Sequence, residues 1–201
     1  VARAIKPTLG LCFFKNYGII ITMNLFALDK DYKNDICTYQ SAKSHDDYRV
    51  SKMIVESCQM LSTTAIHFGY KTRYKKAHYN HPTTKWVRES SANFNTLLSL
   101  AVNLKGEYSR RYNKFTHGCD DVIQHMVSLS FDDNFKKCFD YDYATPIPLC
   151  MPDEYKINNN NLTDSYRLFF ANKPRLRYYH TQPPEWVSEL RSPHLPPIEL
   201  P

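Results

Sequence analysis

The chain has 201 residues, a hydrophobic content of 42%, 15 Tyr and 11 Phe, which favours one globular domain and argues against a disordered protein. Only five glycines are present, and no G-x-G-x-x-G or G-K-[ST] pattern occurs. The usual glycine-rich loops that bind the phosphates of a nucleotide are therefore absent from the sequence. A net charge of +6 and a pI near 8.9 favour an anionic partner such as phosphate or nucleic acid.

Residues 1–22 precede the first methionine. Their short apolar stretch is interrupted by Lys15 and Asn16, no cleavage site follows, and it is far too short to cross a membrane. Met23 is followed at once by a compact apolar segment, 24–29. We therefore expect residues 1–22 to be a non-native or disordered extension, and 23–201 to form a single helical domain. Native protein that retained residues 1–22, as judged by its mass, would contradict this interpretation.

Apolar residues at three- and four-residue spacing predict five helical stretches in chain order. The third stretch begins at His81-Pro82, because proline is well placed in the first turn of a helix. This stretch is either one continuous helix or is broken near Ser90-Ser91. The predicted helices cover 31–44, 46–68, 81–112, 119–131 and 163–172.

The rest of the chain is predicted to be irregular. Three prolines interrupt residues 132–161, and seven of the twelve prolines lie from Pro174 onward. The tail is therefore expected to run extended over the surface and to be anchored by Trp186. The predicted fold is all-α, a single-core bundle of about five helices with an extended proline-rich C-terminal tail.

The six cysteines are widely separated, without a C-x-x-C pair, so zinc-ribbon spacing is missing and reduced thiols are expected. His78 and His81 lie three residues apart and would need a third metal ligand, which no spacing singles out. We therefore predict no metal site, and the sequence leaves the cofactor unknown.

Three polar residues lie along the border of the second predicted helix. His45 is followed by Lys52 and Glu56 at intervals close to two and three helical turns, which places them on one stripe. This set suits proton transfer combined with anion binding, with His45 and Glu56 as catalytic candidates. An ordinary helix rim with a Lys–Glu pair four residues apart explains the pattern equally well.

Residues 70–88 hold six Lys or Arg and no Asp or Glu. A solvated loop is one interpretation. The other is a surface that binds phosphate or nucleic acid through Arg73, Lys75 and Lys76, with neighbouring tyrosines stacking on bases.

The segment that follows supplies further candidates. His81 and Glu89 are candidates to move a proton, whereas Arg88 suits bidentate binding of a phosphate or carboxylate. Trp86 and Asn93 are candidates for substrate contact. The alternatives are that His81 orients the turn, that Trp86 is core, and that Glu89 is the buried partner of Arg88.

Arg111 lies at the end of the same helical pattern, together with Glu107 and Lys114. Cations near a helix C-terminus are favoured by the helix dipole, which alone explains the pattern. Arg111 is nevertheless a second candidate for binding the anion.

A combination of short motifs runs from Met23 to Trp186, beginning with Met-Asn-x-Phe-x-Leu-Asp over residues 23–29. The other motifs are Lys52-Met53-Ile54 with Glu56, Asn80-His81-Pro82, Trp86 with Arg88-Glu89-Ser90, Glu107-Tyr108 with Arg111-Tyr112, Met151-Pro152-Asp153-Glu154-Tyr155-Lys156, Ser165-Tyr166-Arg167 and Pro184-Glu185-Trp186. This combination resembles a family of small helical proteins encoded by tailed phages. Ser44 and Asn113 depart from the family's pattern, where Lys and Gly are expected. The resemblance implies a phage origin, a start at Met23 and action in the cytoplasm of the infected host cell, but no particular chemistry.

Two functions are compatible with these residues. The first is an enzyme that acts on a nucleotide or a DNA base, for modification or repair, with a polar pocket between helices. The second is a non-catalytic module that binds nucleic acid or a host protein through its basic surface. Charged residues buried together would favour the enzyme, and charged residues spread over the solvent face would favour the module. No membrane partner is expected, and the oligomeric state stays open.

Overall fold

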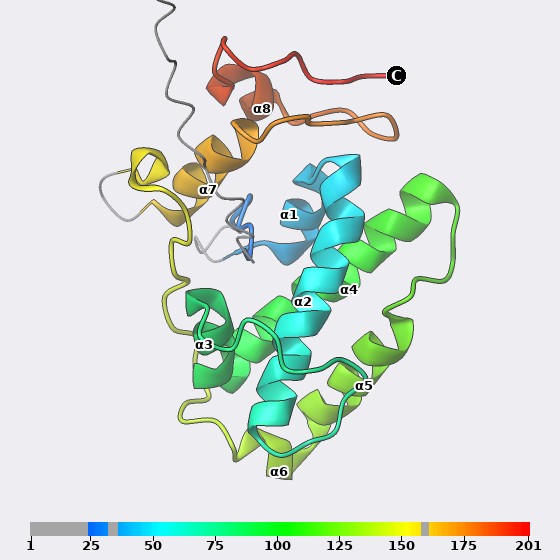
Figure 1. Ribbon diagram of the computed structural model, residues 1–201, viewed down its shortest axis with the longest axis vertical. Coiled ribbons are helices and arrows are strands. Elements are labelled where there is room, and N and C mark those ends of the chain that lie inside the picture. Colours follow the sequence, from blue (N-terminus) through cyan, green and yellow to red (C-terminus); the bar gives the residue numbers. More distant parts are fainter. Residues whose placement is uncertain (1–23, 32–35, 158–160) are drawn as a thin grey trace, which may run out of the picture.

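The computed structural model describes residues 24–31, 36–157 and 161–201, and these form an all-α fold (Figure 1). The predicted fold class is confirmed. The predicted extension, 1–22, lies outside the described residues. Within the described ranges the elements are α1 (Thr38–Ser44), α2 (Asp47–His67), α3 (Pro82–Glu89), α4 (Ser91–Tyr112), α5 (Asp120–Phe131), α6 (Asp133–Lys136), the 3-10 turn η1 (Asp153–Tyr155), α7 (Leu162–Ala171) and α8 (Glu185–Leu190).

The two long helices, α2 and α4, pack along each other and form the centre of the molecule (Figure 1). The predicted apolar stripe of α2 is buried, as Val50, Ile54 and Leu61 show, and it meets Leu97, Leu104 and their neighbours on α4. Burial of such a stripe is what stabilises a helix in a globular protein. The helices run antiparallel, because Tyr112 at the end of α4 donates to the carbonyl of Asp47 at the start of α2 (2.9 Å).

The predicted break near Ser90 is present and separates α3 from α4. Ser90 has an extended backbone (φ −143°, ψ 141°), its hydroxyl accepts from Ala92 N–H and donates to Tyr143 O, and Ser91 N–H donates to Tyr141 O (3.0 Å). The break is therefore fixed by a distant segment of chain.

Three local predictions need correction. The first helix begins at Thr38 and not at residue 31, because Ile36 pairs with Lys30 and Cys37 N–H donates to Asp29 O (2.9 Å). The segment 132–161 contains α6, whose Phe135 is buried among aromatic rings. The proline-rich tail contains α8, which begins directly after Pro184. With these short helices, the described residues hold eight α-helices in place of about five.

The two ends of α2 have different surroundings. The loop 70–81 with α3, α5 and α6 surrounds its C-terminal half, whereas α1, α7, α8 and the residues from 24 to 31 gather near its N-terminal end (Figure 1). Residues 24–28 are fully buried although they form no helix or strand. Arg167 of α7 holds this segment by donating to Leu28 O (2.8 Å) and to Asp29 (3.0 Å).

No helix in the described part of the chain is both long enough and apolar enough to cross a bilayer.

Candidate active site

A group of polar side chains with unsatisfied atoms lies where the N-terminal half of α2 meets the segment 24–28 and the end of α7. We call it the α2–α7 cluster. The ring of His45 contacts Phe26 and Phe170, Lys173 lies over Phe169 and near Phe26, and Lys173 feels the charges of Lys52 and Glu56. Asn24 precedes Phe26 by two residues. It consists of Asn24, His45, Lys52, Glu56 and Lys173.

Glu56 is the carboxylate of this cluster. It is buried, with 6% of its surface exposed. One oxygen, Oε1, pairs with Lys52 Nζ at 2.8 Å, while Oε2 has no hydrogen-bond partner among the described residues. The predicted Lys–Glu pair therefore exists, but it satisfies only half of the carboxylate. An unsatisfied buried acceptor costs about 1–3 kcal/mol, so its retention calls for an explanation.

Lys173 supplies an amine. It follows α7 by two residues and is half-buried, with Nζ 3.5 Å from the centroid of the Phe169 ring and 6.0 Å from that of Phe26. No hydrogen bond or ion pair of this amine is found within the described ranges. Burial lowers the pKa of Lys173 from 10.5 to about 7; Arg49 and Lys52 lower it further, and Glu56 opposes them.

His45 connects α1 to α2 and is fully buried. Its Nδ1 lies 2.6 Å from Ser41 O, and its ring makes edge contacts with Phe26 and Phe170. Burial lowers the pKa of His45 to about 3, so the ring is neutral at ordinary pH. The carbonyl contact assigns the proton to Nδ1, which makes Nε2 an acceptor. Nε2 has no partner in the described structure.

Asn24 completes the cluster. The residue is fully buried, and neither Oδ1 nor Nδ2 finds a partner within the described ranges. The region thus holds an amide, an imidazole acceptor, a carboxylate oxygen and an amine of lowered pKa, with His45 and Glu56 about 16 Å apart along the helix. The carboxylate of Glu56 can give or take a proton.

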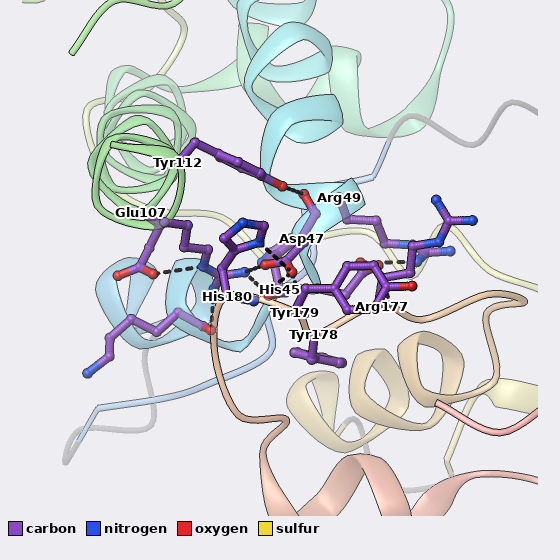
Figure 2. A network of polar contacts seen from close by, with 12 residues as sticks. His45, Asp47, Arg49, Glu107, Tyr112, Arg177, Tyr178, Tyr179 and His180 are labelled. Carbon is purple, nitrogen blue, oxygen red and sulfur yellow. Dashed lines mark hydrogen bonds and ion pairs between the residues drawn. The ribbon is translucent and has the colours of Figure 1, made fainter. Parts of the chain in front are cut away.

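A second polar network lies beside it, and we call it the C-terminal clamp (Figure 2). Asp47 Oδ2 accepts from the backbone N–H groups of Tyr179 (2.6 Å) and His180 (3.0 Å), and it lies 3.1 Å from His180 Nδ1. Its other oxygen pairs with Arg111 Nη1 at 3.1 Å. These contacts fasten the chain after α7 to the start of α2.

Arg111 is at the centre of the clamp. Its side chain is fully buried, pairs with Glu107 (3.2 Å) and Asp47, and donates to the carbonyls of His45 (2.8 Å) and Lys43 (2.9 Å). The sequence suggested that Arg111 binds a substrate anion. In the structure two carboxylates of the protein already balance its charge.

A parallel set of contacts holds the neighbouring residues. Asp46 pairs with Arg49 (3.0 Å) and accepts from Arg177 N–H (3.3 Å), and Tyr178 donates to Ser44 O (3.0 Å). Burial raises the pKa of Asp46, although Arg49 opposes the shift. Arg49 also lies over Phe170, with 5.5 Å from Cζ to the ring centroid, and so connects the clamp to the α2–α7 cluster.

Arg88 and Glu89 lie elsewhere, near the C-terminal end of α2. Both line a cleft of about 350 Å³, which also includes His67 and Lys85. Arg88 donates to Tyr79 O (2.7 Å) and lies 4.0 Å from the centroid of the Tyr79 ring, while Glu89 accepts from Thr145 (3.2 Å). Glu89 is therefore not the buried partner that the sequence suggested for Arg88.

The other candidates of this segment have structural contacts. His81 caps α3 by accepting from Thr83 N–H (3.3 Å), and Trp86 is buried and donates to Thr145 O (2.9 Å). The amide of Asn93 is buried and bonds to Trp86 O, Thr145 Oγ1 and Thr145 N–H. Asn93 thus fastens the chain at Thr145 to the break between α3 and α4.

The basic loop is exposed. Arg73 pairs with Asp121 (2.8 Å) and donates to Gly118 O, Lys76 lies 4.6 Å from the Tyr79 ring centroid, and Lys75 points to solvent. A further cleft of about 520 Å³, beside Trp86 and Thr145, has no ionisable side chain in its lining.

The structure therefore pairs two of the predicted site residues, Lys52 and Glu56. His45 lies about three helical turns away, among Phe26 and Phe170, and the other predicted site residues lie in the clamp, in the α3 region and on the loop. Sequence reasoning missed Asn24 and Lys173. Lys173 directly follows the predicted helix 163–172, but no spacing relates it to Glu56, which lies more than one hundred residues away in the sequence.

Within the described ranges no three His, Cys, Asp or Glu side chains are grouped so as to hold a metal ion. The five described cysteines are free thiols. Of these, Cys119 lies 3.3 Å from Tyr74 Oη.

Comparison of the chain with family models, with curated proteins and with solved structures finds no match.

Proposed function

We propose that the protein is an enzyme acting on a nucleotide or a DNA base, and that the α2–α7 cluster is its active centre. The observation that carries the proposal is the buried carboxylate of Glu56, of which one oxygen pairs with Lys52 and the other has no partner among the described residues. Leaving such groups unsatisfied lowers stability, and active sites are where proteins retain this kind of cost.

The roles follow from the geometry. Glu56 is placed to give or take a proton, because its Oε2 is unoccupied. Lys52, whose side chain is 41% exposed, is the cation at the rim that suits a phosphate.

The motifs listed for the sequence support a tailed-phage origin, and with it action in the cytoplasm of an infected host cell. The basic loop supports a nucleic-acid substrate in a different way. Lys75 and Lys76 are exposed, and Tyr79 already carries a cation against its ring. Such a surface would contact backbone phosphates away from the reacting base.

The alternative function, a non-catalytic binding module, is favoured by that same loop, whose cations are spread over the solvent face. It requires only the loop and leaves the α2–α7 cluster without a use.

A thermal-shift screen against bases, nucleotides and short DNA separates the two functions, because a ligand stabilises the protein in proportion to its affinity for the folded state. We expect one base or nucleotide to raise the melting temperature of the wild type, and Glu56→Gln to abolish the shift. The matched control is Arg88→Ala, which alters the other ionisable cleft and should retain it.

A response to long DNA alone, falling steeply with salt and lost in the Lys75→Ala/Lys76→Ala variant, would overturn the enzyme and establish the binding module.

A further inference from the structure

A cleft of about 400 Å³ lies between the N-terminal half of α2 and the C-terminal end of α4, beside the C-terminal clamp. Its α2 wall carries Tyr48 and Lys52, which lie one helical turn apart and so share one face of the helix. Its α4 wall carries Tyr108 and Tyr112 at the same spacing. Tyr112 donates to Asp47 O (2.9 Å), which fastens the two walls to each other (Figure 2).

Aromatic rings form much of this lining. Tyr48 is 56% exposed although it lies in a cleft. Tyr108 is half-buried and is held by its neighbours, with its ring centroid 5.0 Å from that of Tyr112 and 4.8 Å from that of His117. Tyrosine rings presented by two facing helices offer their faces to a planar, aromatic ligand.

The charge that the cleft offers to a ligand is positive. Lys52 and Lys114 line it, and both are exposed. The lining also includes the carboxylate of Asp47, but one of its oxygens pairs with Arg111 and the other accepts from backbone N–H groups. An anion in the cleft therefore meets two ammonium groups and a carboxylate whose charge is already balanced.

Two other clefts of the described structure lack this combination. The cleft beside Trp86 has no ionisable side chain in its lining. The cleft at Arg88 sets the acids Glu89 and Asp140 against its cations, Lys85 and Arg88. The cleft between α2 and α4 instead combines aromatic faces with cations, which are the two features that a base joined to a phosphate requires.

We propose that the cleft between α2 and α4 binds one nucleotide, either free or as a unit of a DNA strand. Its base stacks on Tyr48 and Tyr108. Its phosphate is bound by Lys52 and Lys114. The volume of the cleft lies within the range of about 300–1,000 Å³ that is usual for small-ligand sites. The inference rests on the proposed function in taking a nucleotide as the ligand, and it deepens that function by naming the surface that binds it.

Lys52 connects the cleft to the proposed active centre. Its amine pairs with Glu56 Oε1 at 2.8 Å, and Val55, which also lines the cleft, directly precedes Glu56 in α2. A nucleotide whose phosphate is bound by Lys52 is therefore a neighbour of the carboxylate to which the proposed function assigns proton transfer.

Photo-cross-linking of the whole protein tests where the base lies. The probe is iododeoxyuridine monophosphate, whose excited base couples to an aromatic ring stacked on it, and peptide mass mapping locates the product. Stacking tolerates any base, so a uracil nucleotide is a fair probe. We expect cross-links at Tyr48 or Tyr108, suppressed by deoxyuridine monophosphate and far less by deoxyuridine, which lacks the phosphate.

Tyr39 is the internal control for this experiment. It is 54% exposed, and Lys43 Nζ lies 5.2 Å from its ring centroid, so it offers a similar ring and cation outside the cleft. A yield at Tyr39 equal to that at Tyr48 and Tyr108 would overturn the proposal. This comparison within the wild type needs no variant to fold.

Calorimetric titration with deoxyuridine monophosphate tests the two kinds of contact separately. Tyr48→Leu should weaken binding by about 10-fold, since stacking of a base on an aromatic ring is worth that much or more. Lys114→Gln should weaken binding and also reduce its dependence on salt. The matched controls, Tyr39→Leu and Lys43→Gln, should bind as the wild type does. Wild-type affinity and salt dependence in both cleft variants would contradict the proposal.

The source of the nucleotide follows from one further probe, a tetranucleotide that carries the iodinated base. Cross-linking of Tyr48 or Tyr108 by the tetranucleotide at lower concentration than by the monophosphate supports the cleft and assigns its ligand to a DNA strand. The reverse order supports the cleft and assigns its ligand to free nucleotides. Failure of both probes to label either tyrosine would overturn the proposal.

The outcomes also separate this inference from the proposed function. Stabilisation by a nucleotide that is lost in Glu56→Gln but retained in Tyr48→Leu and Lys114→Gln would overturn the cleft and leave the nucleotide-directed enzyme in place. Cross-linking at Tyr48 or Tyr108 with unchanged affinity in Glu56→Gln would support the cleft and remove Glu56 from the proposed active centre.

Discussion

The C-terminal clamp and the α2–α7 cluster lie side by side at the same end of the molecule, and His45 belongs to both. Its carbonyl accepts from Arg111 of the clamp, while its ring faces the aromatic residues around the cluster. Both regions bury ionisable groups. In the clamp, Asp47 has partners for both of its oxygens, whereas in the cluster Glu56 has a partner for only one.

Fully paired and half-paired buried charges have different effects on a folded protein. A paired and hydrogen-bonded charge fixes one arrangement of the chain, and its removal leaves an uncompensated partner behind. An unpaired group gives no such support, so a protein loses little stability when it is neutralised. We therefore expect the clamp to support stability and the unpaired groups of the cluster not to support it, and four measurements of stability test that division.

The largest effect is expected for Arg111→Met. The substitution leaves Asp47 and Glu107 buried without their shared cation, which should lower the free energy of unfolding by about 3–5 kcal/mol. Urea denaturation followed by circular dichroism measures this loss. Arg110 is the matched control, because it pairs with the same Glu107 but its side chain is 53% exposed, so Arg110→Met should lose less than about 1 kcal/mol. Equal losses for the two variants would break the comparison.

The next effect comes from making the same chemical change in both regions. Glu107→Gln weakens contacts to two arginines and should lower the free energy of unfolding by about 1–3 kcal/mol. Glu56→Gln loses only a pair with the exposed amine of Lys52, so it should be neutral within about 0.5 kcal/mol or stabilising. Both values come from the same urea titration. A larger loss for Glu56→Gln would make Glu56 a structural residue.

The third effect depends on pH. Burial lowers the pKa of His45 from 6.5 to about 3, so between these values the unfolded chain binds a proton that the folded chain does not. Stability should therefore fall as the pH drops through this window, by up to about 1.4 kcal/mol per pH unit. His45→Gln should reduce that slope, and His194→Gln, at an exposed position, should not. Identical slopes for wild type and His45→Gln would show that the ring is not held neutral.

The smallest expected effect is the pH dependence of stability that Lys173 contributes above pH 7. Burial lowers the pKa of Lys173 from 10.5 to about 7, so the unfolded chain carries the extra proton between these values. Stability should rise with pH across this window, less steeply than for His45 because the amine is half-buried. Lys173→Met should be more stable than the wild type at pH 6 and lose that advantage by pH 10. Lys85→Met, on the exposed face of α3, is the control, and the same pH dependence in both variants would contradict the assignment.

The features predicted correctly from the sequence are those that depend only on residues close together in the chain. The stripe of α2, the start of α3 at Pro82 and the loop 70–81 all follow from local spacing and turn chemistry, and all are confirmed. The late start of α1 and the helix α6 were missed, because they depend on contacts with residues that are not adjacent in the chain. For α8 a local signal was present, since a proline directly precedes it.

The candidate site divides in the same way. His45, Lys52 and Glu56 were grouped by helical periodicity, and the structure pairs Lys52 with Glu56, whereas His45 contacts Phe26 and Phe170. Asn24 lies in a segment before α2 and Lys173 lies about one hundred residues after it. No local pattern could therefore relate either residue to α2. Arg111 was interpreted as an anion site because its type and spacing suit one, whereas the distant Asp47 decides its actual partners.

The burial of residues 24–28 against α7 has a consequence for how the protein is made. Translation at about 5–20 residues per second needs roughly 6–23 seconds to add the 117 residues between Glu56 and Lys173. During that interval the segment 24–28 and the N-terminal half of α2 emerge without the aromatic residues of α7 that cover them. The nascent chain therefore exposes these apolar residues until α7 has been synthesised, and during that interval they are a surface that chaperones can bind.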